Sequence, residues 1–204
     1  LAIRYGVAEI PWTEKRDPRA THYLEIALRA APDRRGADED QIPPANFVFV
    51  IDTSGSMEGT KINGVLTGMR ALFAALRPQD TIGIVDFDIQ ARTVLPATKV
   101  SDLTPAAFNG ALRQLVAAGG TDIALGMEAG VAEAASNTTP GAISHIFLFS
   151  DGNPTDGMTE WLQIRAAIVE ALRGTSIRVS TFGFGADANG RELDALAGIT
   201  GGSY

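Results

Sequence analysis

The feature that most constrains the fold is a series of short apolar runs that alternate with amphipathic stretches from Asn46 onward. Residues 47–51 and 146–149 are wholly apolar. Between them, the apolar residues of 60–77 recur with the period of an α-helix. Strands that are apolar on both faces are typical of parallel sheets covered by helices. The pattern therefore predicts an α/β fold with a doubly wound, mostly parallel, Rossmann-like sheet flanked by helices.

The other elements follow the same alternation. We expect strands at 81–87, 91–95, 143–150 and 177–182, and helices at 60–77, 105–118, 121–135, 159–173 and 190–197. Thr60 and Thr104 are expected to cap helices. The short link at 88–90 predicts a hairpin, and the sheet should therefore have one antiparallel edge strand.

The chain divides into two regions. Residues 1–45 are expected to be an N-terminal extension with one strand at 22–30 and an exposed linker rich in proline and charge. Residues 1–20 are weakly patterned, and Pro11 and Pro18 interrupt any long element. Residues 46–204 should form the main domain. A further strand and a C-terminal helix are expected to follow Tyr204, where this chain ends.

Composition excludes several classes of function. The 204 residues include 17 basic and 24 acidic side chains, a formal net charge of −7, and no cysteine. An acidic chain without a basic cluster is not expected to bind nucleic acid or anionic membranes. The absence of cysteine rules out disulfides and thiolate metal sites. No run reaches the 18 or more apolar residues of a membrane helix, so no membrane insertion is expected in this chain.

The loop after the first apolar strand carries oxygen side chains at alternate positions. Asp52, Ser54 and Ser56 offer one carboxylate and two hydroxyls, and Gly55 tightens the loop between them. Such hard oxygen donors suit Mg²⁺ first, with Ca²⁺ or Mn²⁺ as alternatives. The structural alternative is a Ser/Gly-rich turn in which the aspartate caps the next helix.

Two further loops are expected at the same edge, because ligands of parallel sheets lie at the carboxyl ends of the strands. They contribute Thr121, after Gly119-Gly120, and Asp151, after the apolar strand at 146–149. Five oxygen side chains would then surround one cation and leave a coordination position open. Helix capping is the alternative role of Thr121, and a turn cap that of Asp151. Asp122 and Asp156 are interpreted as solvated loop carboxylates.

Other residues that could suggest chemistry are interpreted structurally. Asp86 and Asp88 fit the rim of a hairpin, and His22 and His145 lie at strand starts far apart in the sequence. The glycine-containing loop at 183–187 lacks the fingerprint of a phosphate-binding loop. Trp161 is expected to be half-buried near the Asp151 loop, with an alternative role as an aromatic anchor of the binding face.

The three loop motifs together resemble a known family. Asp-x-Ser-Gly-Ser at 52–56, then Gly-Gly-Thr at 119–121 and Ser-Asp-Gly at 150–152, are similar in order and placement to the von Willebrand factor type A (VWA) domain, whose metal-ion-dependent adhesion site (MIDAS) uses these segments. The resemblance covers about 46–204. The motifs at 49–57, 59–62, 78–80, 84–87 and 119–121 resemble a bacterial subgroup related to inter-α-trypsin-inhibitor heavy chains.

The resemblance implies roles for the five residues. Ser54 and Ser56 would bind the metal directly, and Asp52, Asp151 and Thr121 directly or through water. A partner protein would supply a glutamate or aspartate carboxylate to the open position. The family also implies a periplasmic, cell-surface or secreted location.

We therefore expect a monomeric, metal-dependent adhesion module rather than an enzyme. One alternative is a metal-assisted phosphohydrolase on a similar sheet. Such enzymes usually need a second acid two residues after the nucleophilic aspartate, plus a lysine, whereas this chain has Ser54 there and only Lys61 nearby. The other alternative is a structural domain of a larger envelope protein, in which the metal stiffens the loops.

Overall fold

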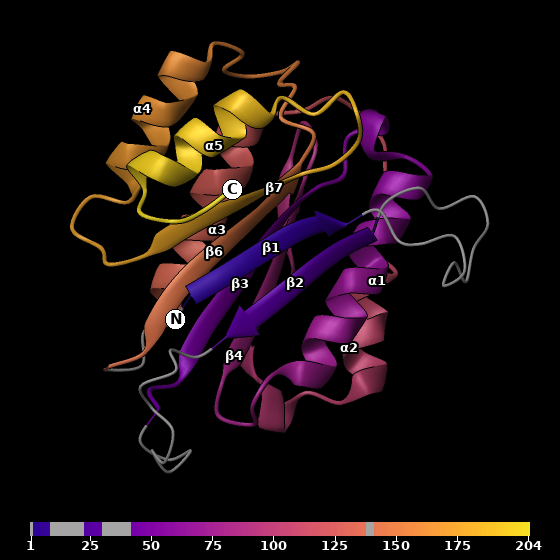
Figure 1. Ribbon diagram of the computed structural model, residues 1–204, viewed down its shortest axis with the longest axis vertical. Coiled ribbons are helices and arrows are strands. Elements are labelled where there is room, and N and C mark those ends of the chain that lie inside the picture. Colours follow the sequence, from indigo (N-terminus) through magenta and orange to yellow (C-terminus); the bar gives the residue numbers. More distant parts are fainter. Residues whose placement is uncertain (1, 9–22, 30–41, 138–140) are drawn as a thin grey trace. The chain divides into compact units, whose positions relative to one another are not determined.

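The computed structural model describes residues 2–8, 23–29, 42–137 and 141–204 (Figure 1). The chain forms two compact units, Leu1–Ile42 and Pro43–Tyr204. The first holds β1 (Ala2–Ala8) and β2 (Tyr23–Arg29), which pair in antiparallel register. The expected strand at 22–30 corresponds to β2, whereas β1 was missed because the sequence at 2–8 mixes apolar residues with Arg4 and Gly6. His22 and most of the expected linker lie outside the described residues.

The second unit is built on a five-stranded sheet of order β5-β4-β3-β6-β7. Its strands are β3 (Ala45–Asp52), β4 (Thr81–Phe87), β5 (Ala91–Lys99), β6 (Ile143–Ser150) and β7 (Arg178–Gly183). β3 pairs in parallel with β4 and β6, and β6 pairs in parallel with β7, while β5 is antiparallel to β4. The predicted mostly parallel sheet with one antiparallel edge strand is confirmed.

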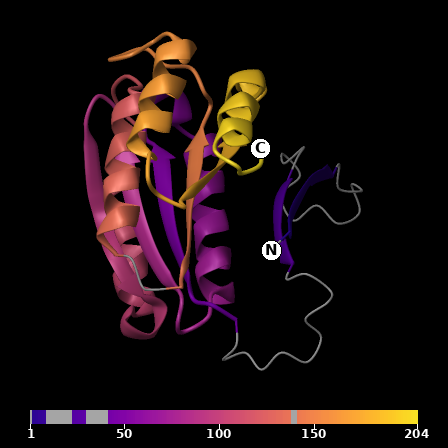
Figure 2. The same cartoon turned by 90° about the vertical axis from the view of Figure 1, so that its left-hand side faces the viewer.

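Helices cover both faces of this sheet. They are α1 (Thr60–Ala75), α2 (Pro105–Leu112), α3 (Ile123–Ser136), α4 (Trp161–Ala171) and α5 (Gly190–Ile199), with short 3-10 helices η4 (Gly55–Met57) and η5 (Val100–Asp102). Figure 2 shows α3 and α4 on one side of the strands and α1 on the other. Within the described ranges, no helix is both long enough and apolar enough to cross a membrane.

The two faces of the sheet have different cores. Val48 and Val50 of β3 pack with side chains of α3 and α4 in one buried cluster. Phenylalanine side chains follow one another across the strands, with ring centroids 5.2 Å apart for Phe49 and Phe147 and 4.8 Å apart for Phe149 and Phe182. Because successive strand residues point to opposite faces, each apolar strand supplies both layers.

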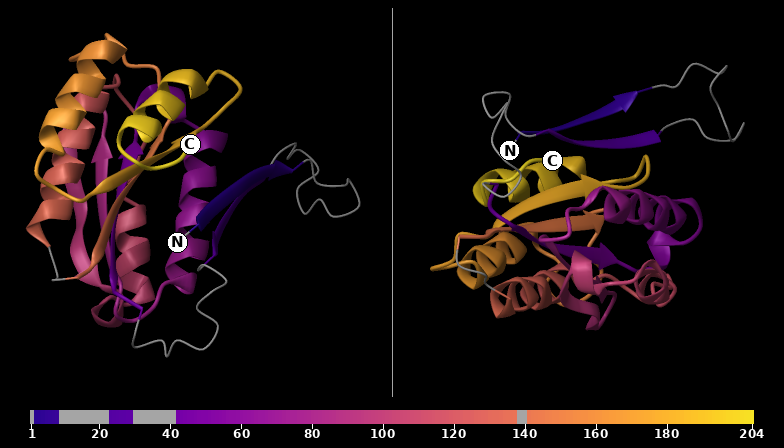
Figure 3. Two further views of the ribbon diagram at one scale, coloured as in Figure 1. Left: turned by 60° about the vertical axis from the view of Figure 1, so that its left-hand side comes forward. Right: turned by 90° about the horizontal axis from the view of Figure 1, so that it is seen from below.

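Helix α3 lies very close to the sheet because it carries glycine where it meets the strands. A β-carbon at Gly126 would lie 2.5 Å from Cδ1 of Phe87, and one at Gly130 would overlap Val50. This close approach holds α3 against β3 and β4, and the loop that precedes α3 carries Thr121. Figure 3 shows α3 packed along the strands in two further views.

Two predicted elements differ in length from the observed ones. β5 continues to Lys99 rather than ending at 95, and α2 ends at Leu112 rather than continuing to 118. Val116, which lies beyond the observed end of that helix, is 68% exposed. The amide of Ala118 donates to the Thr53 carbonyl at 2.7 Å, and this bond holds the segment in the rim loop instead of in the helix.

Two helix caps also differ from expectation. Asp122, interpreted as a solvated carboxylate, is the N-cap of α3 and accepts from the amide of Leu125 at 3.0 Å. Helix α3 therefore begins after Thr121, which is not its cap. Helix α1 starts at Thr60 itself, and its N-cap is Gly59 with φ of 78°. A carboxylate accepts an amide hydrogen bond more strongly than a hydroxyl does, which favours Asp122 as the cap.

Candidate metal-binding site

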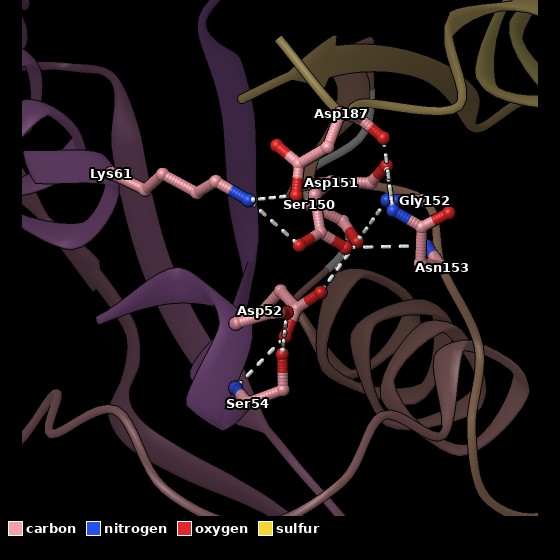
Figure 4. Close-up of polar contacts among 9 residues, drawn as sticks. Asp52, Ser54, Lys61, Ser150, Asp151, Gly152, Asn153 and Asp187 are labelled. Carbon is pink, nitrogen blue, oxygen red and sulfur yellow. Dashed lines mark hydrogen bonds and ion pairs between the residues drawn. The ribbon is translucent and has the colours of Figure 1, made fainter. Parts of the chain in front are cut away.

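The predicted site begins at the last residue of β3. Asp52 is fully buried, and both oxygens of its carboxylate accept hydrogen bonds. The amide of Ser54 donates to Oδ1 at 2.9 Å, and the hydroxyl of Ser150 donates to Oδ2 at 2.5 Å (Figure 4). A carboxylate offers about four lone-pair sites, so these bonds orient Asp52 without exhausting its capacity to bind a cation.

The two serine hydroxyls lie next to Asp52 and next to each other. Oγ of Ser54 and Oγ of Ser56 are 3.1 Å apart. Ser54 is buried and Ser56 is exposed, so this pair spans the distance from the buried carboxylate to the solvent. The predicted Asp-x-Ser-x-Ser loop therefore presents its three oxygen side chains in one continuous group.

The loop after β6 brings a second buried carboxylate to the same edge. Asp151 is fully buried; its Oδ1 accepts from the amide of Asn153 at 3.2 Å, and its Oδ2 accepts from Nζ of Lys61 at 3.0 Å. Gly152 has φ of 73°, which favours glycine, and its amide donates to Oγ of Ser150 at 2.9 Å. Ser150 thus joins the Asp52 loop to the Asp151 loop.

The Thr121 loop is tied to both of the other loops by its main chain. The carbonyl of Gly119 accepts from the amide of Gly55 at 3.0 Å. Thr121 donates its amide to Oγ1 of Thr155 at 2.9 Å and accepts from the amides of Thr155 and Asp156 at 3.0 and 3.1 Å. The backbone therefore brings the three predicted loops together, and it places buried Thr121 between the other two.

Burial is the main electrostatic influence on Asp52. It raises the pKa of the Asp52 carboxyl, against the lowering effect of the hydrogen bonds from Ser150 and Ser54. The negative charge of Asp151 adds to this rise. The two carboxylates at this edge repel each other, and burial makes Asp52 costly to ionise; a bound cation relieves both effects.

The residues at this edge fit a small divalent cation. The donors are carboxylate and hydroxyl oxygens, which hard cations such as Mg²⁺ prefer. Within the described ranges, no three carboxylate, imidazole or thiol side chains gather at one point where they could share a metal. The candidate site relies on two carboxylates and neutral hydroxyls, a weakly charged donor set that suits a cation which keeps some of its water ligands.

Three residues around the site were given no role in it by sequence reasoning. Ser150 bridges the two loops, and Lys61 of α1 contacts both Asp151 and Asp187 of the loop after β7. Ser150 had a recognisable signal, because it is a polar residue at the end of an otherwise apolar strand. Asp187 had none, because only the folded sheet brings its loop beside Lys61.

The residues interpreted structurally are occupied by other interactions. Asp86 is buried and forms an ion pair with Arg92. His145 is buried, stacks on Phe147 with ring centroids 4.5 Å apart, and shares a hydrogen bond with Ser180 at 2.9 Å. Trp161 is half-buried, as expected.

The fold and this edge define a doubly wound α/β domain that carries oxygen donors at the carboxyl ends of its parallel strands. The sequence model of one family, the von Willebrand factor type A domain, matches residues 46–204. The chain belongs to this family.

Two curated relatives illustrate how the domain is used in longer proteins. The Escherichia coli (strain K12) protein YfbK is 31% identical over 206 residues, which cover 100% of this chain and 34% of YfbK. Inter-alpha-trypsin inhibitor heavy chain H2 of Mus musculus is 31% identical over 155 residues, which cover 72% of this chain and 16% of that protein. The chain thus spans about a third of YfbK, and the expected similarity to the heavy chains is confirmed.

Solved structures share the fold. A von Willebrand factor type A structure from Catenulispora acidiphila has a TM-score of 0.67 and 25% identity, over 78% of this chain and 38% of that one. The pilus adhesin SpaC from Lactobacillus rhamnosus GG has a TM-score of 0.62 and 17% identity, over 76% of this chain and 28% of that one. The second likeness is one of fold alone.

Proposed function

We propose that this domain is a metal-dependent protein-binding module with a MIDAS. Asp52, Ser54, Ser56, Thr121 and Asp151 would hold one Mg²⁺, with Ca²⁺ or Mn²⁺ as alternatives. A bound cation supplies a positive charge that a glutamate or aspartate carboxylate of a partner protein can ligate. The name of a pilus adhesin that shares this fold supports an adhesion role.

The observation that carries this proposal is the pair of buried carboxylates with a hydroxyl pair beside them. Asp52 and Asp151 are both fully buried, and among the described residues Lys61 pairs with Asp151 but no basic side chain pairs with Asp52. Ionised carboxylates are rarely buried unless they are paired or coordinate a metal. Ser54 and Ser56 extend the same group of oxygens to the surface, where a partner can reach it. These features support a cation site with one side open to solvent.

The residues of this chain would act by holding the donors still. Ser150 and the amide of Ser54 fix the plane of the Asp52 carboxylate, and the main-chain bond from Gly55 to Gly119 fixes the spacing of two loops. A site whose donors are already in place loses little conformational entropy when a ligand binds. Specificity for the partner would come from the loop surfaces around the site.

A phosphohydrolase is less well supported. Lys61, the lysine that such an enzyme would need near the site, is engaged by Asp151 and Asp187 at 3.0 and 2.9 Å. Ser54 stands where a second acid would be required. We further propose that the domain acts as a monomer outside the cytoplasm, consistent with the pilus adhesin that shares its fold.

Metal binding is tested by titrating chelator-treated protein with Mg²⁺, Mn²⁺ and Ca²⁺ in a calorimeter. Wild-type protein should bind one ion, and Asp52→Asn should abolish binding while keeping the shape of the side chain. Asp102→Asn, on exposed η5, removes the same charge away from the loops and should bind as wild type does. Equal binding by wild type and Asp52→Asn would refute the metal site.

The open position is tested separately with Mn²⁺-loaded protein. Water molecules on bound Mn²⁺ accelerate the relaxation of solvent protons, and a carboxylate that displaces one should reduce this effect. We expect acetate and a glutamate-containing peptide to lower the relaxation rate, and the matched glutamine peptide to leave it unchanged. If the metal binds but neither carboxylate changes the rate, the proposed recognition of an acidic partner residue is wrong.

A further inference from the structure

A lysine lies directly against one of the two buried carboxylates of the candidate site. Lys61 is the second residue of α1, and its Nζ lies 3.0 Å from Oδ2 of Asp151 and 2.9 Å from Oδ2 of Asp187 (Figure 4). The Lys61 side chain is 15% exposed, and that of Asp187 is 63% exposed. The ammonium group of Lys61 thus joins buried Asp151 to exposed Asp187.

The loop after β7 confines the lysine. Gly185 has φ of 95°, and a β-carbon at this position would overlap Cε of Lys61 and lie 3.0 Å from its Nζ. Asn153 donates its side-chain amide to the carbonyl of Asp187 at 3.1 Å, and the amide of Asn189 donates to the carbonyl of Asp151 at 2.7 Å. The ammonium group is therefore held beside Asp151 by packing as well as by charge.

This arrangement has a consequence for cations. A positive charge fixed beside a carboxylate weakens the attraction of that carboxylate for any second cation, and partial burial limits screening by solvent. The same charge stabilises Asp151 when no metal is bound, because an unpaired buried carboxylate is costly. Asp187 offsets part of the lysine charge from the solvent side.

We propose that Lys61 is a built-in counter-charge to Asp151 that lowers the affinity of the site for divalent cations and stabilises the metal-free domain, and that Asp187 moderates this effect. The proposal rests on the proposed metal site. It assigns Lys61 a role in setting metal affinity without contact with the metal. Removing Lys61 should strengthen metal binding, and removing Asp187 should weaken it.

Three variants of the whole chain test the proposal. Lys61→Met keeps most of the length of the side chain and removes its charge, and Asp187→Asn removes the opposing surface charge. Lys99→Met removes the same charge as Lys61→Met from an exposed lysine. Lys99 pairs with Thr81 at the start of β4, at the opposite end of the sheet from the candidate site.

The first measurement is Mg²⁺ affinity by calorimetry on chelator-treated protein. Lys61→Met should bind Mg²⁺ about tenfold more tightly than wild type, the effect of one unit charge at close range in a partly buried site. Asp187→Asn should bind Mg²⁺ about threefold more weakly, because its charge is farther away and more exposed to solvent. Lys99→Met should match wild type.

The second measurement is the melting temperature with and without Mg²⁺. Lys61→Met should melt below wild type in chelator and recover most of the difference in saturating Mg²⁺, since a ligand stabilises a protein by RT ln(1 + [L]/Kd), which is larger for the variant that binds more tightly. A lysine with only a structural role would lower the melting temperature equally in both conditions and would not tighten metal binding.

The outcomes separate this inference from the proposed function. If wild type binds Mg²⁺ and Lys61→Met binds it equally or more weakly, the counter-charge is refuted and the metal site stands. If wild type binds no divalent cation, both proposals fall. If Lys61→Met does not fold, Asp187→Asn tests the inference instead, because it replaces an exposed residue. Unchanged or tighter Mg²⁺ binding by Asp187→Asn would overturn the inference.

Discussion

Replacing Gly126 with alanine is expected to destabilise the domain, even though alanine is the better helix former. Gly126 lies within α3, against Phe87 of β4. A β-carbon at this position would lie 2.5 Å from Cδ1 and 2.9 Å from Cβ of Phe87, whereas carbon atoms in ordinary contact are about 3.5–4.0 Å apart. Phe87 is fully buried, so its ring has no free space into which to move. Either the ring or α3 must shift by roughly 1 Å.

Two opposing contributions set the size of the effect. Overfilling a packed core costs about 1–3 kcal/mol, and the overlap with a buried ring favours the upper part of this range. Replacing glycine by alanine inside a helix returns about 1 kcal/mol. We therefore expect the free energy of unfolding to fall by about 1–2 kcal/mol.

The matched control is Gly68→Ala in α1. A β-carbon there meets no atom within 4 Å, so only the gain in helix propensity remains. This variant should raise the free energy of unfolding by about 1 kcal/mol. Urea denaturation followed by far-ultraviolet circular dichroism measures both variants, and the two midpoints should move in opposite directions. If Gly126→Ala proved as stable as wild type or more stable, the argument from close packing of α3 would be wrong.

Two further predictions concern His145 and Asp80, which are buried titratable residues outside the candidate site. Burial, helped by the charge of Arg178, lowers the pKa of His145 from 6.5 to about 4, so stability should fall by up to about 3 kcal/mol as the pH drops from about 6.5 to about 4. His145→Gln should remove this part of the pH dependence in urea titrations, and an unchanged slope would contradict it. Burial works to raise the pKa of Asp80, but hydrogen bonds from Arg77 and Ala45 outweigh it and lower the pKa. Asp80→Asn should therefore reduce stability by about 3 kcal/mol near neutral pH, with the difference shrinking as the pH falls below about 4, and a constant difference would refute the assignment.

The sheet could be predicted because its strands are apolar on both faces. The runs at 47–51 and 146–149 have no polar face, so each is expected to be a strand that is buried on both sides. Because helices lie between the strands, parallel pairing follows. Strand β1 could not be predicted, because its sequence forms a strand only through pairing with β2. The early end of α2 could not be predicted either, since it depends on a hydrogen bond from Ala118 to Thr53 in a distant loop.

For the candidate site, sequence reasoning found the residues but not their electrostatic surroundings. Asp52, Ser54 and Ser56 are close in sequence, and the rule that ligands lie at the carboxyl ends of strands brought in Thr121 and Asp151. The same rule does not reveal ion pairs. Lys61 lies in a helix and Asp187 in a loop, and only the path of the main chain shows that Lys61 meets both Asp151 and Asp187.

The hydrogen bond between Ser150 and Asp52 joins residues 98 positions apart. During synthesis, a chain that has left the ribosome only as far as α3 already contains Asp52, both serines of its loop and Thr121. It still lacks β6, which supplies Ser150, and the loop after it, which supplies Asp151. Until that strand emerges and pairs with β3, Asp52 should remain hydrated and ordinary in its acidity. Two fragments divided between α3 and β6 should each lack the buried carboxylate pair, and their reassociation should restore it, so the pair reports that β6 has paired with β3.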